Sequence, residues 1–130
     1  DYLNHTRLFF ALKSLHNFAM NGRVSKAVAS AIGVLNISIF ATASEEGTIQ
    51  KISKCRGEKK VVKSMIEHLE NAGYHGGKIR ISHAYNLKLA HNVRDKILEL
   101  YPHADIIVYP MGGLCTYYAE IGGLLVGCEC

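Results

Sequence analysis

The spacing of hydrophobic residues near the start of the chain predicts a helix. The pattern runs from about Asn4 to Asn21, and Gly22 after it is a residue typical of helix C-termini. Within this range the apolar side chains recur at intervals of four, three and four residues, at Leu8, Leu12, Leu15 and Ala19. Such a stripe covers one face of a helix, so we expect this segment to pack one side against a core.

A second helix is predicted from Lys26 to Leu35, with Ser25 as its N-cap. This segment is unusual because it has almost no polar face. Its apolar residues are Ala27, Val28, Ala29, Ala31, Ile32, Val34 and Leu35. A helix of this kind is buried on all sides or lines an apolar cavity.

The rest of the chain alternates between strand and helix patterns. A strand from Ile37 to Thr42 and a returning strand from Thr48 to Lys54 predict a hairpin, with a bulge because the alternation in the second strand is imperfect. Further strands are expected over Lys78–His83, Ala104–Tyr109 and Leu124–Cys128, and helices over Glu58–Ala72, Leu87–Tyr101 and Leu114–Ile121. The continuous apolar run at Ile106–Tyr109 is typical of a central strand covered on both faces.

The order of these elements predicts the fold class. The strand, helix and strand between Lys78 and Tyr109 imply a parallel pair joined by a right-handed crossover. The hairpin then adds antiparallel edges, which gives an α/β fold with a mixed β-sheet layered with helices. The 130 residues form a single domain over 1–130. Because the chain begins at Asp1 and not at Met, we expect it to be part of a longer protein.

Composition excludes several classes of protein. Apolar residues make up 48% and charged residues 20%, which is typical of a globular protein. The net charge of +4 is only mildly basic, so a dedicated nucleic-acid partner is not expected. The longest uncharged run, Ala27–Ala43, is short for a spanning helix of about 20 residues and predicts no stable membrane insertion.

No catalytic or metal-binding motif is recognisable. The four cysteines have no zinc-site spacing, and they are expected to be free thiols in the cytoplasm. The seven histidines include no HExxH pattern. The sequence therefore predicts no metal and no cofactor.

Two candidate anion sites follow from the residues alone. His83 and the main chain of Gly112-Gly113 are expected at the carboxyl edge of the parallel strands, where a phosphotransferase-like site would lie. A buried structural histidine is the simpler interpretation of His83. Arg23 lies between the two apolar helices and could bind a carboxylate or phosphate through both of its terminal nitrogens, unless it is merely solvated.

A basic run forms a third candidate. It contains Lys51, Lys54, Arg56, Lys59, Lys60 and Lys63. No aromatic residue lies between them to stack on bases, which argues against a nucleic-acid module. A solvated surface and a docking patch for an acidic partner are the remaining interpretations.

Several segments, in order along nearly the whole chain, resemble the DegV family. Asn21–Lys26 together with Gly33–Ile37 is similar to the family's GR[IV]SK…LLNI block. Lys54–Lys60 is similar to its K-x-RG-x-KKA segment. The strand into Ile81–His83 and the ending Gly113–Gly127 match in the same order.

The resemblance implies a function and an architecture. Members of this family are cytoplasmic bacterial proteins in which two α/β domains clasp one fatty acid. This chain corresponds to the DegV-type C-terminal domain of a longer two-domain chain. The resemblance further implies a carrier subunit, not a catalyst, that presents the carboxylate of a long-chain fatty acid to a separate ATP-dependent fatty-acid kinase.

The resemblance also implies site residues. Arg23 matches the family's arginine near the fatty-acid head group. Tyr118 falls where many members have a histidine in a THTG segment, and its hydroxyl can donate a hydrogen bond but carries no positive charge at neutral pH. The residues expected to line the acyl tail are Phe9, Phe10, Leu12 and the second helix, including Ala27 and Ala31.

Overall fold

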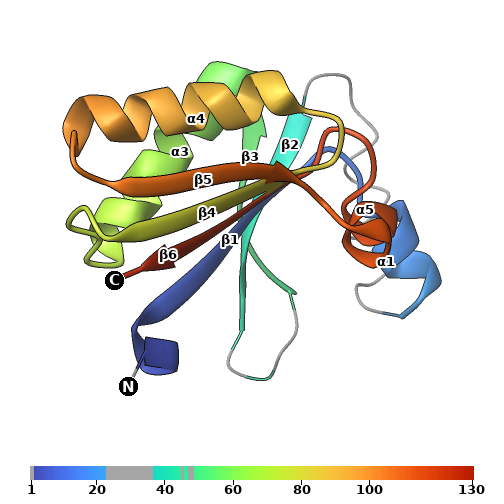
Figure 1. The fold of residues 1–130 in the computed structure, drawn as a ribbon. Coiled ribbons are helices and arrows are strands. Elements are labelled where there is room, and N and C mark those ends of the chain that lie inside the picture. Colours follow the sequence, from blue (N-terminus) through green and yellow to red (C-terminus); the bar gives the residue numbers. More distant parts are fainter. Residues whose placement is uncertain (1, 23–36, 45, 47–48) are drawn as a thin grey trace.

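Six strands form one mixed sheet in the computed structural model, which describes residues 2–22, 37–44, 46 and 49–130 (Figure 1). The strands lie in the order β3-β2-β1-β6-β4-β5. Only β4 and β5 are parallel among these described strands, and the other neighbouring pairs are antiparallel. The strands are β1 (Thr6–Leu12), β2 (Ile37–Ala43), β3 (Ile49–Arg56), β4 (Lys78–His83), β5 (Asp105–Pro110) and β6 (Leu124–Glu129).

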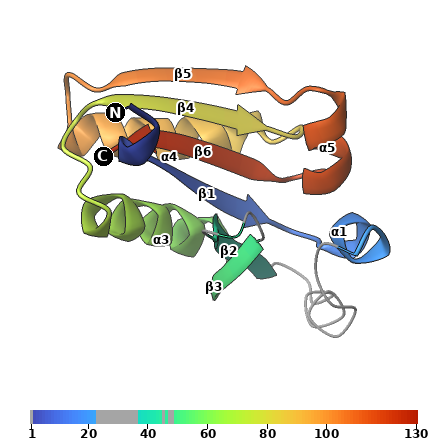
Figure 2. The same ribbon diagram turned by 90° about the horizontal axis from the view of Figure 1, so that it is seen from below.

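The helices lie in two groups. The long helices α3 (Glu58–Asn71) and α4 (Leu87–Leu100) cover one face of the sheet (Figures 1 and 2). The short helices α1 (His16–Met20) and α5 (Gly113–Ala119) lie beside one another at one end of the sheet, and a 3₁₀ turn, η1 (Tyr2–His5), precedes β1. The predicted α/β class, a mixed sheet layered with helices, is confirmed.

The main core lies between the sheet and the two long helices. The apolar stripes of α3 and α4 face the strands, as their helical periodicity predicts. The buried residues of this layer include Val61, Met65 and Leu69 from α3, Ala90, Val93 and Ile97 from α4, and Phe9, Phe40, Ile79, Ile81 and Val126 from the strands.

Local sequence signals explain the elements that were predicted correctly. The Oδ1 of Asn86 accepts a hydrogen bond from the backbone N–H of Leu89 at 3.4 Å and caps α4, as a side chain at this position is expected to do. The hairpin of β2 and β3 forms, and a register shift between Phe40 and Ala41 supplies its bulge. β4 and β5 are parallel neighbours, as the crossover predicts.

The predicted first helix, Asn4 to Asn21, is wrong. Residues Thr6–Leu12 of that range form β1, a strand that pairs with β2 on one side and β6 on the other. The run Leu8–Leu12 is apolar at every position, which suits a strand that faces packed side chains on both sides. The strands that pair with β1 lie far away in the sequence. The spacing of nearby apolar residues therefore cannot predict the hydrogen bonds that make this segment a strand. Within the predicted range, α-helix forms only over the five residues of α1.

The predicted central position of the Ile106–Tyr109 strand is also wrong. β5 lies at the edge of the sheet, with β4 as its only neighbour among the described strands. Ile106 and Val108 pack against the core, whereas Ile107 and Tyr109 on the other face are 49% and 44% exposed. The apolar run therefore marks a strand with one covered face and one open face.

The second predicted helix, Lys26 to Leu35, lies outside the described residues.

Within the described ranges, no helix is both long and apolar enough to cross a membrane.

Candidate functional site

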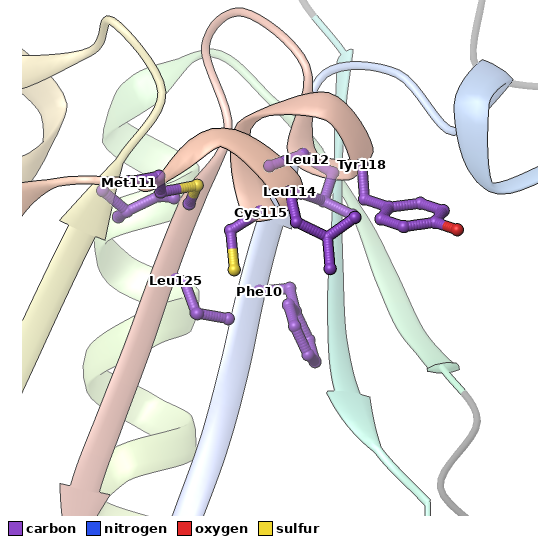
Figure 3. A pocket seen from close by; sticks show the side chains of 9 residues that line it. Phe10, Leu12, Met111, Leu114, Cys115, Tyr118 and Leu125 are labelled. Atoms are coloured by element: carbon purple, nitrogen blue, oxygen red, sulfur yellow. The ribbon is translucent and has the colours of Figure 1, made fainter.

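An apolar pocket of about 210 Å³ lies on the face of the sheet opposite the long helices. It opens between β1, β6 and the short helix α5 (Figure 3). Its lining residues are Phe10, Leu12, Met111, Leu114, Cys115, Tyr118, Ala119, Leu124 and Leu125. Because these side chains are almost all apolar, the pocket suits a hydrocarbon group and offers little to a polar ligand.

The alternation of β1 decides which of its side chains reach the pocket. Phe10 and Leu12 point to the pocket face, where Phe10 pairs across the sheet with Leu125. Phe9 points to the opposite face, where it is buried and stacks on Phe40 with ring centroids 5.9 Å apart. The structure thus brings Phe10 and Leu12 to the pocket and places Phe9 in the helix-side core instead.

Tyr118 lies in the wall of the pocket. It is half-buried in α5, and its ring contacts the ring of Tyr117 edge to face at 5.2 Å. Figure 3 shows its hydroxyl oxygen directed away from the other labelled side chains. Its ring is therefore available to the apolar pocket, while its polar end lies toward the rim.

A polar surface joins α1 to α5 beside the pocket. The amide of Asn17 donates to the backbone oxygen of Tyr117 at 2.7 Å, and the amide of Asn21 donates to the Tyr117 hydroxyl at 3.0 Å. A hollow of about 390 Å³ lies here, lined by Ser14, Asn17, Thr116, Tyr117, Glu120 and Ile121. The chain just before Arg23 is therefore fixed against the helix that carries Tyr118.

Three of the predicted site residues, Arg23, Ala27 and Ala31, lie outside the described residues. Sequence reasoning also missed most of the pocket residues on α5 and β6, such as Leu114 and Cys115. The signal that could have found them is the apolar and aromatic content of the short segment after Gly113, since the structure leaves Leu114, Tyr117 and Ile121 exposed there.

His83, which the sequence places at a candidate anion site, makes hydrogen bonds that stabilise the local structure. The Nδ1 atom of His83 accepts a hydrogen bond from the backbone N–H of Asn86 at 3.1 Å, in the turn before α4. The His83 carbonyl accepts from the N–H of Met111 at 2.9 Å. These bonds hold the turns around the parallel strands together, and they favour a structural histidine over a phosphotransfer residue.

The five described side chains of the basic run, from Lys54 to Lys63, are exposed, and none of them lines the apolar pocket. Lys54 and Arg56 are exposed at the end of β3, and Lys59 and Lys60 are exposed in the first turn of α3. Lys63 is 3.9 Å from Glu67 along the same helix. An exposed pair of this kind adds little stability, so these charges remain available to a partner.

Among the described residues, the titratable groups with clearly shifted pKa values lie in the helix-side core and not at the pocket. Burial raises the pKa of Tyr74 to about 12, and burial together with the Cys130 thiol raises the pKa of Cys128. Within the described ranges, no three or more His, Cys, Asp or Glu side chains gather in a way that could hold a metal ion.

Fold and pocket together define an α/β domain with an apolar binding pocket at one end of its sheet. The DegV family model matches residues 1–128, and the chain belongs to this family. A DegV domain-containing protein of Streptococcus pyogenes serotype M3 is 46% identical over 128 residues. That match covers 98% of this chain and 46% of the relative, so the chain spans about half the length of the curated relatives it matches.

Two solved structures extend the comparison. A DegV family protein from Eubacterium eligens, loaded with heptadecanoic acid, is 54% identical and matches with a TM-score of 0.95. The Fatty Acid Kinase (Fak) B3 protein of Streptococcus pneumoniae, loaded with linoleic acid, is 42% identical with a TM-score of 0.94. Each match covers 98% of this chain and 46% of the solved chain.

Proposed function

We propose that this chain is the C-terminal domain of a two-domain bacterial carrier that binds a long-chain fatty acid in the cytoplasm. The observation that carries the proposal is the apolar pocket between β1, β6 and α5. Two similar proteins were solved with heptadecanoic acid and linoleic acid, which supports an acyl chain as the ligand.

Burial of hydrocarbon supplies the affinity. Each methylene transferred from water to an apolar pocket contributes about 0.8 kcal/mol. An acyl chain therefore binds tightly with few polar contacts, and a pocket lined by Phe10, Leu114 and Leu125 is suited to that task.

The size of the pocket indicates that it covers part of the ligand only. Its volume of about 210 Å³ is below the roughly 300–1,000 Å³ of typical small-molecule sites. We assign the contacts to the rest of the acyl chain to the segment that contains Ala27 and Ala31 and to the other half of the full-length protein.

The carboxylate of the fatty acid requires polar partners at the rim. We assign this role to Arg23, whose guanidinium can form charge-assisted bonds to both carboxylate oxygens. The hydroxyl of Tyr118 would add one hydrogen bond. Their positions, one following α1 and the other within α5, are consistent with a shared rim because Asn17 and Asn21 bind α1 to α5.

The proposed carrier does not catalyse the reaction itself. It presents the carboxylate to a separate ATP-dependent kinase, which transfers a phosphoryl group to a carboxylate oxygen and yields an acyl phosphate. The name of the Streptococcus pneumoniae protein, Fatty Acid Kinase B3, supports this assignment. The exposed basic run offers a surface for the kinase.

Cys115 provides a direct test of the proposal. Its thiol is exposed and lines the pocket, so a bound acyl chain should shield it. We expect heptadecanoic acid to slow the alkylation of Cys115 by iodoacetamide in the full-length protein, as measured by mass spectrometry of the peptide.

The other cysteines are internal controls. Cys130 is partly exposed and does not line the pocket, so its alkylation rate should not change. Heptadecanol should protect Cys115 less well if the carboxylate contributes to binding. An unchanged rate at Cys115 in the presence of heptadecanoic acid would contradict the proposed site.

A further inference from the structure

Glu120, which follows α5, has a backbone conformation that residues with side chains rarely adopt. Its φ is 58° and its ψ is 173°. Glycine adopts a positive φ without steric cost, and Gly122 and Gly123 follow nearby, yet position 120 carries a long charged side chain. A strained residue of this kind persists only where its surroundings hold it, and it points to a role for the side chain.

The carboxylate of Glu120 reaches α1. Its Oε2 atom accepts a hydrogen bond from the backbone N–H of Asn17 at 3.3 Å. Asn17 lies in the first turn of α1, where backbone N–H groups have no partner within the helix. A carboxylate is a strong acceptor for such a group, so this contact couples the end of α5 to the start of α1.

Side chains from α1 and from the turn directly after it make the reciprocal contacts. The Asn17 amide donates to the backbone oxygen of Tyr117 at 2.7 Å. The Asn21 side-chain amide donates both to the Tyr117 hydroxyl at 3.0 Å and to the backbone oxygen of Asn17 at 2.8 Å. The last turn of α5 is therefore held to α1 through its backbone, its aromatic side chain and the Glu120 carboxylate.

This same turn forms part of the apolar pocket. Tyr118 and Ala119 line the pocket, while their neighbours Tyr117 and Glu120 bond to α1. With seven residues, α5 is too short to be stable by itself, so its position depends on what it packs against.

We propose that Glu120 and Asn17 are positioning residues of the acyl pocket. They hold α5 in the place where Tyr118 and Ala119 form the pocket wall, and neither residue lines the pocket itself. The inference rests on the proposed function, because its consequence is a change in the affinity for a fatty acid.

Two substitutions at position 120 separate positioning from general stability. Glu120→Gly removes the carboxylate and accommodates the positive φ, so the variant should unfold at no lower temperature than the parent. Glu120→Gln keeps an oxygen that accepts from the Asn17 N–H and is the matched control. For Asn17→Ala, the control is Asn92→Ala, which changes an exposed asparagine on α4.

The first measurement is the dissociation constant of heptadecanoic acid by calorimetry on the full-length protein. It should rise roughly tenfold in Glu120→Gly, which loses the hydrogen bond from the Asn17 N–H. It should rise by about two- to fivefold in Asn17→Ala, which keeps that N–H and loses only the neutral bond from the Asn17 amide to the Tyr117 backbone oxygen. It should stay at the parent value in Glu120→Gln and Asn92→Ala. An unchanged affinity in Glu120→Gly would overturn the proposal.

The second measurement is amide hydrogen exchange in α5 without any lipid. Exchange over residues 113–120 should be faster in Glu120→Gly than in the parent, and Glu120→Gln should restore the parent rate. If the parent protein binds no heptadecanoic acid, the proposed function fails, and the exchange rates still decide whether Glu120 positions α5. Equal exchange in all three proteins would overturn the positioning role.

Discussion

The pKa of the buried Tyr74 hydroxyl is set by the groups that surround it. The side chain is only 4% exposed, and its ring meets that of Tyr101 edge to face at 5.0 Å. Its hydroxyl donates a hydrogen bond to the Gly77 oxygen at 2.8 Å. Burial, followed by the nearby Cys128 thiol, disfavours the phenolate and raises the pKa of Tyr74 to about 12.

This shift predicts a loss of stability at alkaline pH. The folded state binds the phenol proton more tightly than the unfolded state, where tyrosine titrates near 10. The stabilising contribution is therefore fully present below about pH 10 and is lost as the pH rises through about 12. Urea unfolding of the parent and Tyr74→Phe over this range should show the alkaline loss in the parent and a smaller loss in the variant.

The same variant has a distinct effect at neutral pH. Tyr74→Phe removes the hydrogen bond to Gly77 and should lower the free energy of unfolding by about 1 kcal/mol. A difference between parent and variant that does not change with pH would show that the Tyr74 phenol does not titrate differently on folding.

Neighbouring residues can have unrelated roles, and Phe9 and Phe10 illustrate why the sequence alone did not separate them. The resemblance to the DegV family implies that both line the acyl tail. In the strand β1 their side chains point to opposite faces, so only Phe10 reaches the pocket. The helix predicted for this segment hides that separation, because only the alternation of a strand places adjacent side chains on opposite faces.

At the scale of elements, the turn between α5 and β6 depends on a close approach at Gly123. A Cβ atom on Gly123 would lie 2.7 Å from the backbone oxygen of Ala119 and 2.8 Å from its Cβ. Such contacts are too short, and the two Ala119 atoms cannot rotate away because one is a backbone oxygen and the other is the Cβ attached to the backbone. Any larger residue must move α5 away from β6.

Gly123→Ala should therefore destabilise the protein by about 1–3 kcal/mol, as overpacking generally does. The measurement is the free energy of unfolding in urea. Gly127→Ala is the control in the same segment, because its Cβ would meet Leu8 at an ordinary 3.9 Å. Equal stability of the two variants would mean that the turn relaxes without cost.

The elements that the sequence predicts well are those with local signals. α3 and α4 have apolar stripes at helical spacing, and α4 also has the Asn86 cap. Local spacing predicts a helix over β1, because the strand character of β1 comes from pairing with β2 and β6, which lie far along the chain. It predicts a central position for β5, because an apolar run does not reveal whether a strand has a second neighbour.

At the scale of the whole molecule, the two faces of the sheet differ. α3 and α4 cover one face, whereas the other exposes Ile107 and Tyr109 and holds the apolar pocket near its end. The chain spans 46% of the relatives that it matches. We therefore propose that the other half of the full-length protein covers part of this open face.

The described residues of the basic run do not line the pocket, so the proposed lipid binding and the proposed recognition by a kinase can be tested separately. Lys54, Arg56 and Lys60 are exposed and do not line the pocket. Replacing all three by glutamate should lower the rate of acyl-phosphate formation by the cognate kinase by about tenfold or more at low salt, because charge complementarity accelerates association. The dissociation constant of heptadecanoic acid should not change.

The rate should be measured at several salt concentrations, with Lys88→Glu as the control because it reverses an exposed charge on α4 outside the basic run. If the basic run docks the kinase, the parent rate falls as salt screens these charges, whereas the triple variant is slow at every salt concentration. A triple variant that is phosphorylated as fast as Lys88→Glu would exclude the basic run as the docking surface. A triple variant that loses fatty-acid affinity would show instead that these residues support the fold or the pocket.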